Sequence, residues 1–122
     1  KRVGIISADK SQLTREHLAR SAIGETLPVA LGGMEHCAPF RQAIFSPDGT
    51  LDDDAIRAGV IGVAQELRAG HADLGAILLE CSDLPPYAAD VQRATGLPVF
   101  DFITMINYVH QTLVRRPYHG YL

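Results

Sequence analysis

Short apolar runs alternate with longer amphipathic segments along the whole chain. The apolar runs cover residues 2–7, 27–31, 76–79 and 99–100. They are short, partly β-branched and bounded by polar residues, Gly or Pro, which is typical of strands buried inside a sheet. We therefore expect four short strands, distributed over the length of the chain.

The segments between the first three runs predict helices. Thr14 is a suitable N-cap for the first, which we expect to end near Gly24 because glycine favours the position after a helix. A short helical stretch is expected after Pro39. Residues 52–54, all aspartates, open the longest helix, where carboxylates complement the helix dipole, and Gly70 ends it. Because capping explains these aspartates, a metal role for them is the weaker alternative.

Two further helices are expected in the last third of the chain. One begins at Pro85 or Pro86, since proline is tolerated in a first helical turn, and ends at Gly96. The other covers residues 102–114, and residues 115–122 form an irregular tail. An apolar stripe at helical spacing predicts the buried face of this last helix: Phe102, Ile106, Val109 and Leu113.

Strands that alternate with helices predict an α/β fold. We expect one three-layer domain over residues 1–122, with a mainly parallel four-stranded sheet covered by helices on both faces. Ligands of such sheets bind outside the carboxyl ends of the strands. Three loops should meet there, at residues 7–11, 32–37 and 81–85, and Ser7, Asp9 and Ser11 of the first are candidate ligand contacts.

Composition limits the classes of function. The 122 residues have a net charge of -3 and no basic stripe, so we expect no nucleic-acid partner. The apolar runs are much shorter than the ~20 residues of a membrane span, and the first ends too early for a signal peptide. We therefore expect a cytoplasmic protein without a membrane partner. The chain begins at Lys1 and not at a methionine, which suggests a fragment or a processed chain.

Neither metal nor nucleotide chemistry has a motif here. The two cysteines, Cys37 and Cys81, lack CxxC spacing, and the five histidines do not pair at the spacing of zinc ligands. No glycine-rich phosphate loop follows any strand. We expect no metal and no cofactor, and we interpret Cys37 as a structural residue at a loop-to-helix junction.

Cys81 is the strongest candidate for chemistry. It follows the strand at residues 76–79 and precedes the expected helix at Pro85. The N–H groups and positive dipole end of a helix favour a thiolate over a thiol, so this placement predicts a reactive cysteine. The alternative is a buried structural cysteine, the commonest state of a free thiol. Ser82 could cap the helix or bind a carboxylate, and Asp101 could cap the last helix or line the site.

The run from Glu80 to Tyr87, ECSDLPPY, together with residues 95–101, TGLPVFD, resembles the aspartate/glutamate/hydantoin racemase superfamily. The resemblance is to the second half of uncharacterised members, where a cysteine and a proline-bearing turn sit at the end of a strand. The opening residues 3–9 and Arg115-Arg116-Pro117 resemble the same half.

The resemblance implies a cofactor-independent racemase or epimerase of a small carboxylate or amino acid. Members have two similar α/β domains, each with one cysteine. The resemblance therefore implies that residues 1–122 are one domain of a longer two-domain protein and that Cys81 is one thiol acid/base. The second thiol would come from a complementary half-domain or from a partner chain in a homodimer. Ser82 would help to hold the substrate carboxylate. Asp83 is a further candidate substrate contact, although the family more usually has Asn, Glu or His at this position. Its carboxylate would repel an anionic substrate unless it points away.

Two other functions stay open. A decarboxylase or a maleate cis–trans isomerase of the same superfamily would not need two thiols in every case. A non-catalytic α/β module that binds a carboxylate or a protein partner would need no reactive cysteine at all.

Overall fold

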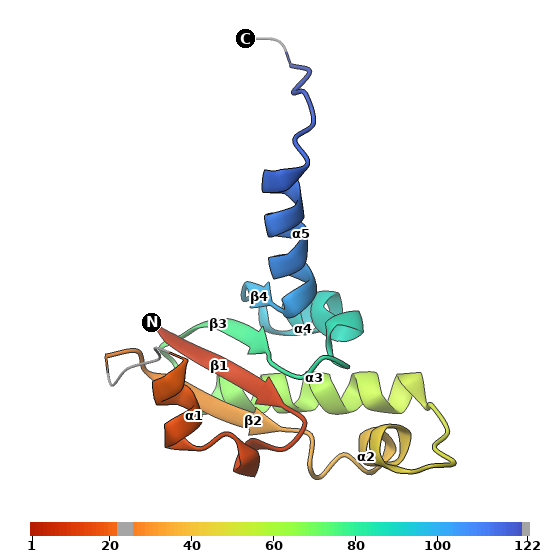
Figure 1. Cartoon of the computed structure of the whole chain (residues 1–122). Helices are drawn as coiled ribbons and strands as arrows, with labels where there is room; N and C mark the ends of the chain where they lie inside the picture. The colour runs from red at the N-terminus through yellow and green to blue at the C-terminus, as the bar shows by residue number, and fades with distance from the viewer. Residues whose placement is uncertain (22–25, 121–122) are drawn as a thin grey trace.

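Four parallel strands form the sheet that the alternating pattern predicts. The computed structural model describes residues 1–21 and 26–120 (Figure 1). The strands are β1 Arg2–Ser7, β2 Val29–Gly33, β3 Leu74–Leu79 and β4 Val99–Phe100, in the spatial order β2-β1-β3-β4. All three strand pairings are parallel. The fold is therefore α/β, as expected.

Helices connect the strands, with bounds close to those predicted. The α-helices of the described residues are α1 Arg15–Arg20, α2 Ala38–Phe45, α3 Asp53–Gly70, α4 Ala88–Thr95 and α5 Phe102–Leu113. Thr14 caps α1 by accepting a hydrogen bond from the backbone N–H of His17, and Asp52 caps α3 by accepting one from Ala55. The predicted end of the first helix at Gly24 lies outside the described residues.

One face of the sheet is covered by α3 and α4. The side chains of Ile6, Ile77 and Leu79 on this face are almost completely buried against Val60 of α3 and its neighbours. Gly32 allows α3 to approach β2, because a Cβ there would lie 2.6 Å from Val63 Cγ1. β2 extends to Gly33, although the glycine pair suggested an earlier end, because Gly32 and Gly33 pair with Ile6 and Ser7 of β1.

The opposite face is only partly covered. Leu13 lies just before α1 and Leu18 lies in it. Both line a cavity together with Ile5 and Leu78 of this face. α5 does not return to the sheet but projects from the domain beyond β4 (Figure 1). The prediction that α5 buries an apolar stripe is therefore wrong in this structure, since Ile106, Val109 and Leu113 are 50%, 48% and 79% exposed.

The segment after β3 also differs from the prediction. A 3-10 turn at Pro85–Tyr87 precedes α4, so the expected single helix is divided in two. Pro85 and Pro86 have no N–H to donate, and the turn is instead closed by the N–H of Tyr87, which donates to the carbonyl of Leu84 at 3.0 Å. Gly96 ends α4 with φ of 67°, as its glycine predicts.

Within residues 1–21 and 26–120, no helix has the length and apolar content needed to cross a bilayer.

Candidate active site

The carboxyl ends of β1, β2 and β3 are joined by backbone hydrogen bonds. The N–H of Met34, just after β2, donates to the carbonyl of Ser7 at 3.0 Å, and the N–H of Glu80, just after β3, donates to Ile6 at 2.9 Å. Ser7 is 5% exposed. The structure therefore brings the three predicted loops to one edge of the sheet.

The first loop is held by its own side chains. The Asp9 carboxylate accepts hydrogen bonds from the N–H of Ser11 at 2.9 Å and from its hydroxyl at 2.7 Å. The hydroxyl bond, followed by the backbone bond, lowers the pKa of Asp9. The Asp9 carboxylate and the Ser11 hydroxyl thus bind each other. Of the three predicted ligand contacts in this loop, Ser7 is the one whose hydroxyl is not part of this pair.

Glu35 joins the first and second loops and was missed by the sequence analysis. Its carboxylate accepts from the N–H of Lys10 at 3.3 Å and lies 3.5 Å from the ammonium of Lys10. Burial alone would raise the pKa of Glu35, but backbone N–H groups and Lys10 together lower it. Gly33 is needed here because a Cβ would lie 2.8 Å from the backbone nitrogen of Lys10. A glycine followed two residues later by a carboxylate was the available signal.

The thiol of Cys81 is half-buried and lies 3.7 Å from the Asp83 carboxylate, to which it can donate a hydrogen bond. Burial raises the pKa of Cys81, and the charge of Asp83 raises it further, although the backbone N–H of Asp83 opposes this. The prediction that a helix start stabilises a thiolate is therefore not met. The helical turn that follows Cys81 begins only at Pro85 and has three residues, so burial and the Asp83 carboxylate decide the direction of the shift.

Ser82 and Asp83 are exposed in the turn after Cys81. Ser82 does not cap a helix, because the residue before the 3-10 turn is Leu84. Instead Ser82 lines a cavity of about 400 Å³ together with the start of α5. Asp101 borders the same cavity and caps α5, accepting from the N–H of Thr104 at 2.7 Å.

Two larger cavities flank the end of β3 on the open face of the sheet. One, of about 610 Å³, lies between the ends of β1 and β3 and α1, and Ser7 lines it. The other, of about 550 Å³, lies between the end of β3 and the base of α5 and is lined by Phe100, Phe102 and Tyr108. Leu78 and Glu80 border both cavities. Glu80 is exposed at the boundary between them, next to Cys81 in the chain.

Cys37 lies against α3 and lines a cavity of about 420 Å³ together with Lys10 of the first loop. A Cβ at Gly59 of α3 would lie 2.6 Å from its sulfur, so the thiol fills space next to the helix. This packing supports a structural role. No three His, Cys, Asp or Glu side chains within the described ranges converge closely enough to hold a metal ion.

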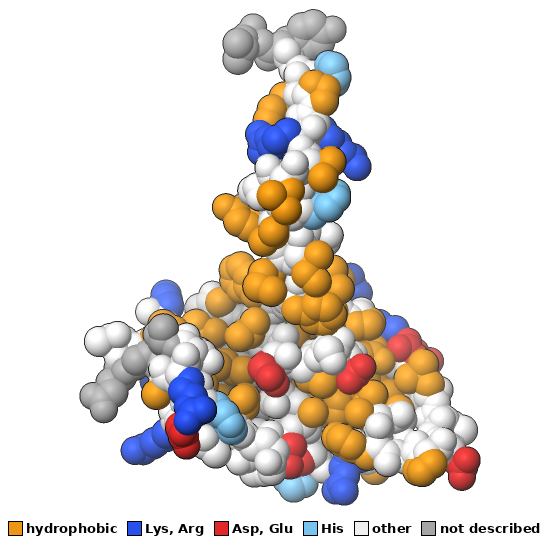
Figure 2. Space-filling view, viewed as in Figure 1, with side chains coloured by type: hydrophobic (Ala, Val, Ile, Leu, Met, Phe, Trp, Pro, Cys, Tyr) orange, Lys and Arg blue, Asp and Glu red, His pale blue; other side chains and the backbone are white. Residues whose placement is uncertain are grey.

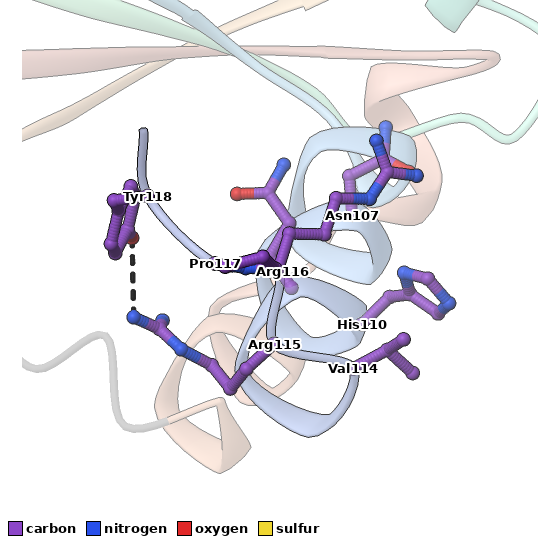
Figure 3. Close-up of a pocket in the computed structure, with 8 residues that line it drawn as sticks. Asn107, His110, Val114, Arg115, Arg116, Pro117 and Tyr118 are labelled. Carbon is purple, nitrogen blue, oxygen red and sulfur yellow. Dashed lines mark hydrogen bonds between the residues drawn. The ribbon is translucent and has the colours of Figure 1, made fainter. Parts of the chain in front are cut away.

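A cavity of about 370 Å³ at the far end of α5 is formed by one short stretch of chain, residues 107–118 (Figure 3). Arg115 donates to the hydroxyl of Tyr118 at 3.1 Å and its guanidinium lies 5.4 Å from the ring centre. No strand end contributes to this cavity, so we place the candidate site at the sheet edge instead.

Comparison with known proteins gives a consistent result. The chain is 40% identical over 70 residues to a dimethylsulfoniopropionate lyase of Durusdinium sp. clade D, a match that covers 57% of this chain and 23% of that protein. It is 32% identical over 123 residues to dimethylsulfoniopropionate lyase 5 of Emiliania huxleyi (strain CCMP1516), covering 86% of this chain and 24% of the relative. Lyase 7 of the same strain is 40% identical over 86 residues, covering 67% and 25%. The chain thus spans about a quarter of the length of the curated relatives that it matches.

No protein-family model matches the chain. No solved structure matches it either.

These findings contradict the resemblance to racemases and the isomerase function drawn from it, including the decarboxylase and cis–trans isomerase alternatives. The relatives carry the name of an enzyme, but of a lyase. The error has a physical cause. A cysteine at a strand end before a proline turn is a local arrangement, and such an arrangement does not by itself specify the reaction.

Proposed function

We propose that this chain is the thiol-bearing part of a lyase that cleaves dimethylsulfoniopropionate, with Cys81 as the proton acceptor. The observation that carries the proposal is the shared name of its relatives, over matches that include up to 86% of the chain. Because the chain spans only about a quarter of each relative, further groups of the active site would belong to polypeptide outside the matched part.

The substrate named in these relatives suits a simple elimination. It carries a carboxylate at one end and a dimethylsulfonium cation at the other, with two carbons between them. A base removes a proton from the carbon next to the carboxylate, and that electron pair forms the carbon–carbon double bond. The carbon–sulfur bond breaks, and its electrons leave with dimethyl sulfide. The products are dimethyl sulfide, acrylate and the proton held by the base.

The surroundings of Cys81 suit a cationic substrate. Asp83 lies 3.7 Å from the thiol and Glu80 precedes it in the chain, so two carboxylates flank the sulfur. They would repel a dicarboxylate but attract a sulfonium group. The positive charge of the bound sulfonium would also favour the thiolate, because an opposite charge nearby lowers the pKa of a thiol. Substrate binding would then lower the pKa of Cys81, which burial and Asp83 raise in the free protein.

The carboxylate end of the substrate needs hydrogen-bond donors. Ser82 is exposed beside Cys81, and Ser7 lines the cavity that Glu80 borders. We propose these two hydroxyls as the donors. Asp9 and Ser11 complete the predicted contact set, and because they bind each other, their role would be to hold the loop that carries Ser7.

The test is release of dimethyl sulfide, measured by gas chromatography on the longest native form of the polypeptide that contains this sequence. We expect Cys81→Ala to lower the rate by about 10²-fold or more, which is the usual contribution of a general base. Cys37→Ala is the matched control, since its thiol packs against α3, and should keep near-normal turnover. Absence of dimethyl sulfide with the unmodified protein would refute the function. Release that survives Cys81→Ala would refute the assignment of the base.

A further inference from the structure

Charged side chains of both signs are scattered over the body of the domain, whereas hydrophobic side chains gather along α5 and around its base (Figure 2). Between α3 and α4, charged side chains meet in a network of four: Asp53, Arg57, Asp90 and Arg93. The Arg57 guanidinium donates to the carboxylates of Asp53 on α3 and Asp90 on α4. Because the Asp90 side chain is only 14% exposed, water screens its pair with Arg57 less than it screens a surface pair. Arg57 therefore holds the first turn of α4 against α3.

The same guanidinium contacts the turn that follows Cys81. It lies 5.4 Å from the ring centre of Tyr87, within the range of a cation–π interaction. The Tyr87 hydroxyl donates to the other oxygen of the Asp53 carboxylate at 3.0 Å. This hydroxyl, followed by Arg57, lowers the pKa of Asp53, so the carboxylate is charged at neutral pH. Tyr87 is the N-cap residue of α4 but makes no capping bond with its side chain, so its contacts with α3 fix the start of α4 instead.

Two backbone hydrogen bonds lead from Tyr87 back to Cys81. The N–H of Tyr87 donates to the carbonyl of Leu84 at 3.0 Å, and the N–H of Leu84 donates to the carbonyl of Cys81 at 3.2 Å. The Leu84 side chain between them is completely buried. On its other side Cys81 follows β3, which the sheet holds in place. The position of the thiol is therefore defined by the sheet before it and by the anchored turn after it.

We propose that Arg57 is a positioning residue for the Cys81 thiol, which it holds through Tyr87 and the turn closed at Leu84. A planar guanidinium suits this task, because it can bind two carboxylates and lie over an aromatic ring at the same time. Misplacement of a catalytic group by about 1 Å can cost about 10²-fold in rate, so an anchor outside the site can control turnover. The consequence for turnover rests on the proposed lyase function, whereas the position of the thiol does not.

The reactivity of the thiol tests the positioning directly. Iodoacetamide labelling of the peptide that contains Cys81 is followed by mass spectrometry over a range of pH, on the longest native form of the polypeptide. Burial, more than the Asp83 charge, raises the pKa of Cys81. Arg57→Met releases the turn and admits water to the thiol, so the labelling profile should shift to lower pH and labelling at neutral pH should become several times faster.

Arg93→Met is the matched control. Arg93 also binds Asp90, but it does so from within α4 and is 71% exposed, so it does not join the two helices. This variant should keep the unmodified labelling profile. Tyr87→Phe is the second variant, in case Arg57→Met fails to fold. It removes the bond to Asp53 and keeps the buried ring, so it should shift the profile in the same direction by a smaller amount.

Turnover gives the second measurement. Arg57→Met should lower kcat for release of dimethyl sulfide about tenfold or more and change KM less, because the displaced group acts on the proton that is removed. A labelling profile that Arg57→Met leaves unchanged, or that Arg93→Met shifts equally, would overturn the positioning role whether or not the protein is a lyase. Absence of dimethyl sulfide with the unmodified protein would refute only the lyase function, and a shifted labelling profile would still support the role of Arg57.

Discussion

The hydroxyl of Tyr87 makes one hydrogen bond, and its removal tests how much this bond stabilises the turn after Cys81. Tyr87 is 4% exposed and donates a hydrogen bond to the Asp53 carboxylate at 3.0 Å. The bond connects the turn that follows Cys81 to the first turn of α3. Arg57 lies over the tyrosine ring at 5.4 Å from its centre and also pairs with Asp53. Tyr87→Phe removes the bond and keeps the buried ring.

We expect Tyr87→Phe to lower the free energy of unfolding by about 1–2 kcal/mol near neutral pH. A hydrogen bond to a charged group is commonly stronger than this, but Asp53 is half-exposed and keeps Arg57, so water can replace part of the loss. For a domain of this size the change corresponds to a fall of about 4–8 °C in Tm. Urea denaturation followed by circular dichroism measures it. Tyr108→Phe is the control, because Tyr108 is 72% exposed and should be unaffected.

The effect should also depend on pH. Burial, and then the bond to Asp53, raise the pKa of Tyr87 from 10.0 to about 12. Below about pH 10 the phenol is neutral in both the folded and the unfolded chain, so its full contribution is present. Between about pH 10 and 12 the unfolded chain loses this proton first, and the folded state is destabilised. By about pH 11 the wild type should lose on the order of 1 kcal/mol that Tyr87→Phe does not lose. Equal stability of the two proteins at neutral pH, or a difference that stays constant to pH 11, would refute the reasoning.

Two further predictions concern α3 and the thiol. Gly59→Ala should destabilise the chain by about 1–3 kcal/mol, because the new Cβ would lie 2.6 Å from the sulfur of Cys37. Gly62→Ala meets nothing within 4 Å and should stabilise the chain by up to about 1 kcal/mol through helix propensity. Thermal unfolding measures both variants, and equal effects would contradict the packing of Cys37 against α3. Asp83→Asn should lower the pKa of Cys81, since the Asp83 charge contributes to raising it. The rate of iodoacetamide labelling in a Cys37→Ser background should therefore rise at a lower pH, and an unchanged profile would exclude this influence of Asp83.

The strands could be predicted because their pattern is local. The first and last, Arg2–Ser7 and Val99–Phe100, have the predicted bounds. The second was placed two residues early, because Gly32 and Gly33 suggest an end to a strand. In the structure both glycines pair with β1, and Gly32 is required by the approach of α3. A contact between distant segments thus decided the bounds of β2, and a local pattern does not contain that information.

The candidate site could be predicted in position but not in detail. The rule for parallel sheets brought Ser7 and the residues after β3 to one edge, as the structure has them. The pairing of Asp9 with Ser11, the link from Glu35 to Lys10 and the raised pKa of Cys81 depend on which polar groups meet in space.

Asp83 shows how the substrate assumed for a site changes the meaning of one residue. Beside an anionic substrate its carboxylate is a departure from the pattern, because like charges repel across the short distance from the thiol. Beside a sulfonium cation the same carboxylate attracts the group that leaves. Both substrates carry a carboxylate beside the proton that would be removed, so the proposed role of Cys81 would be the same for either. The charge next to the thiol therefore distinguishes the two chemistries, whereas the thiol itself does not.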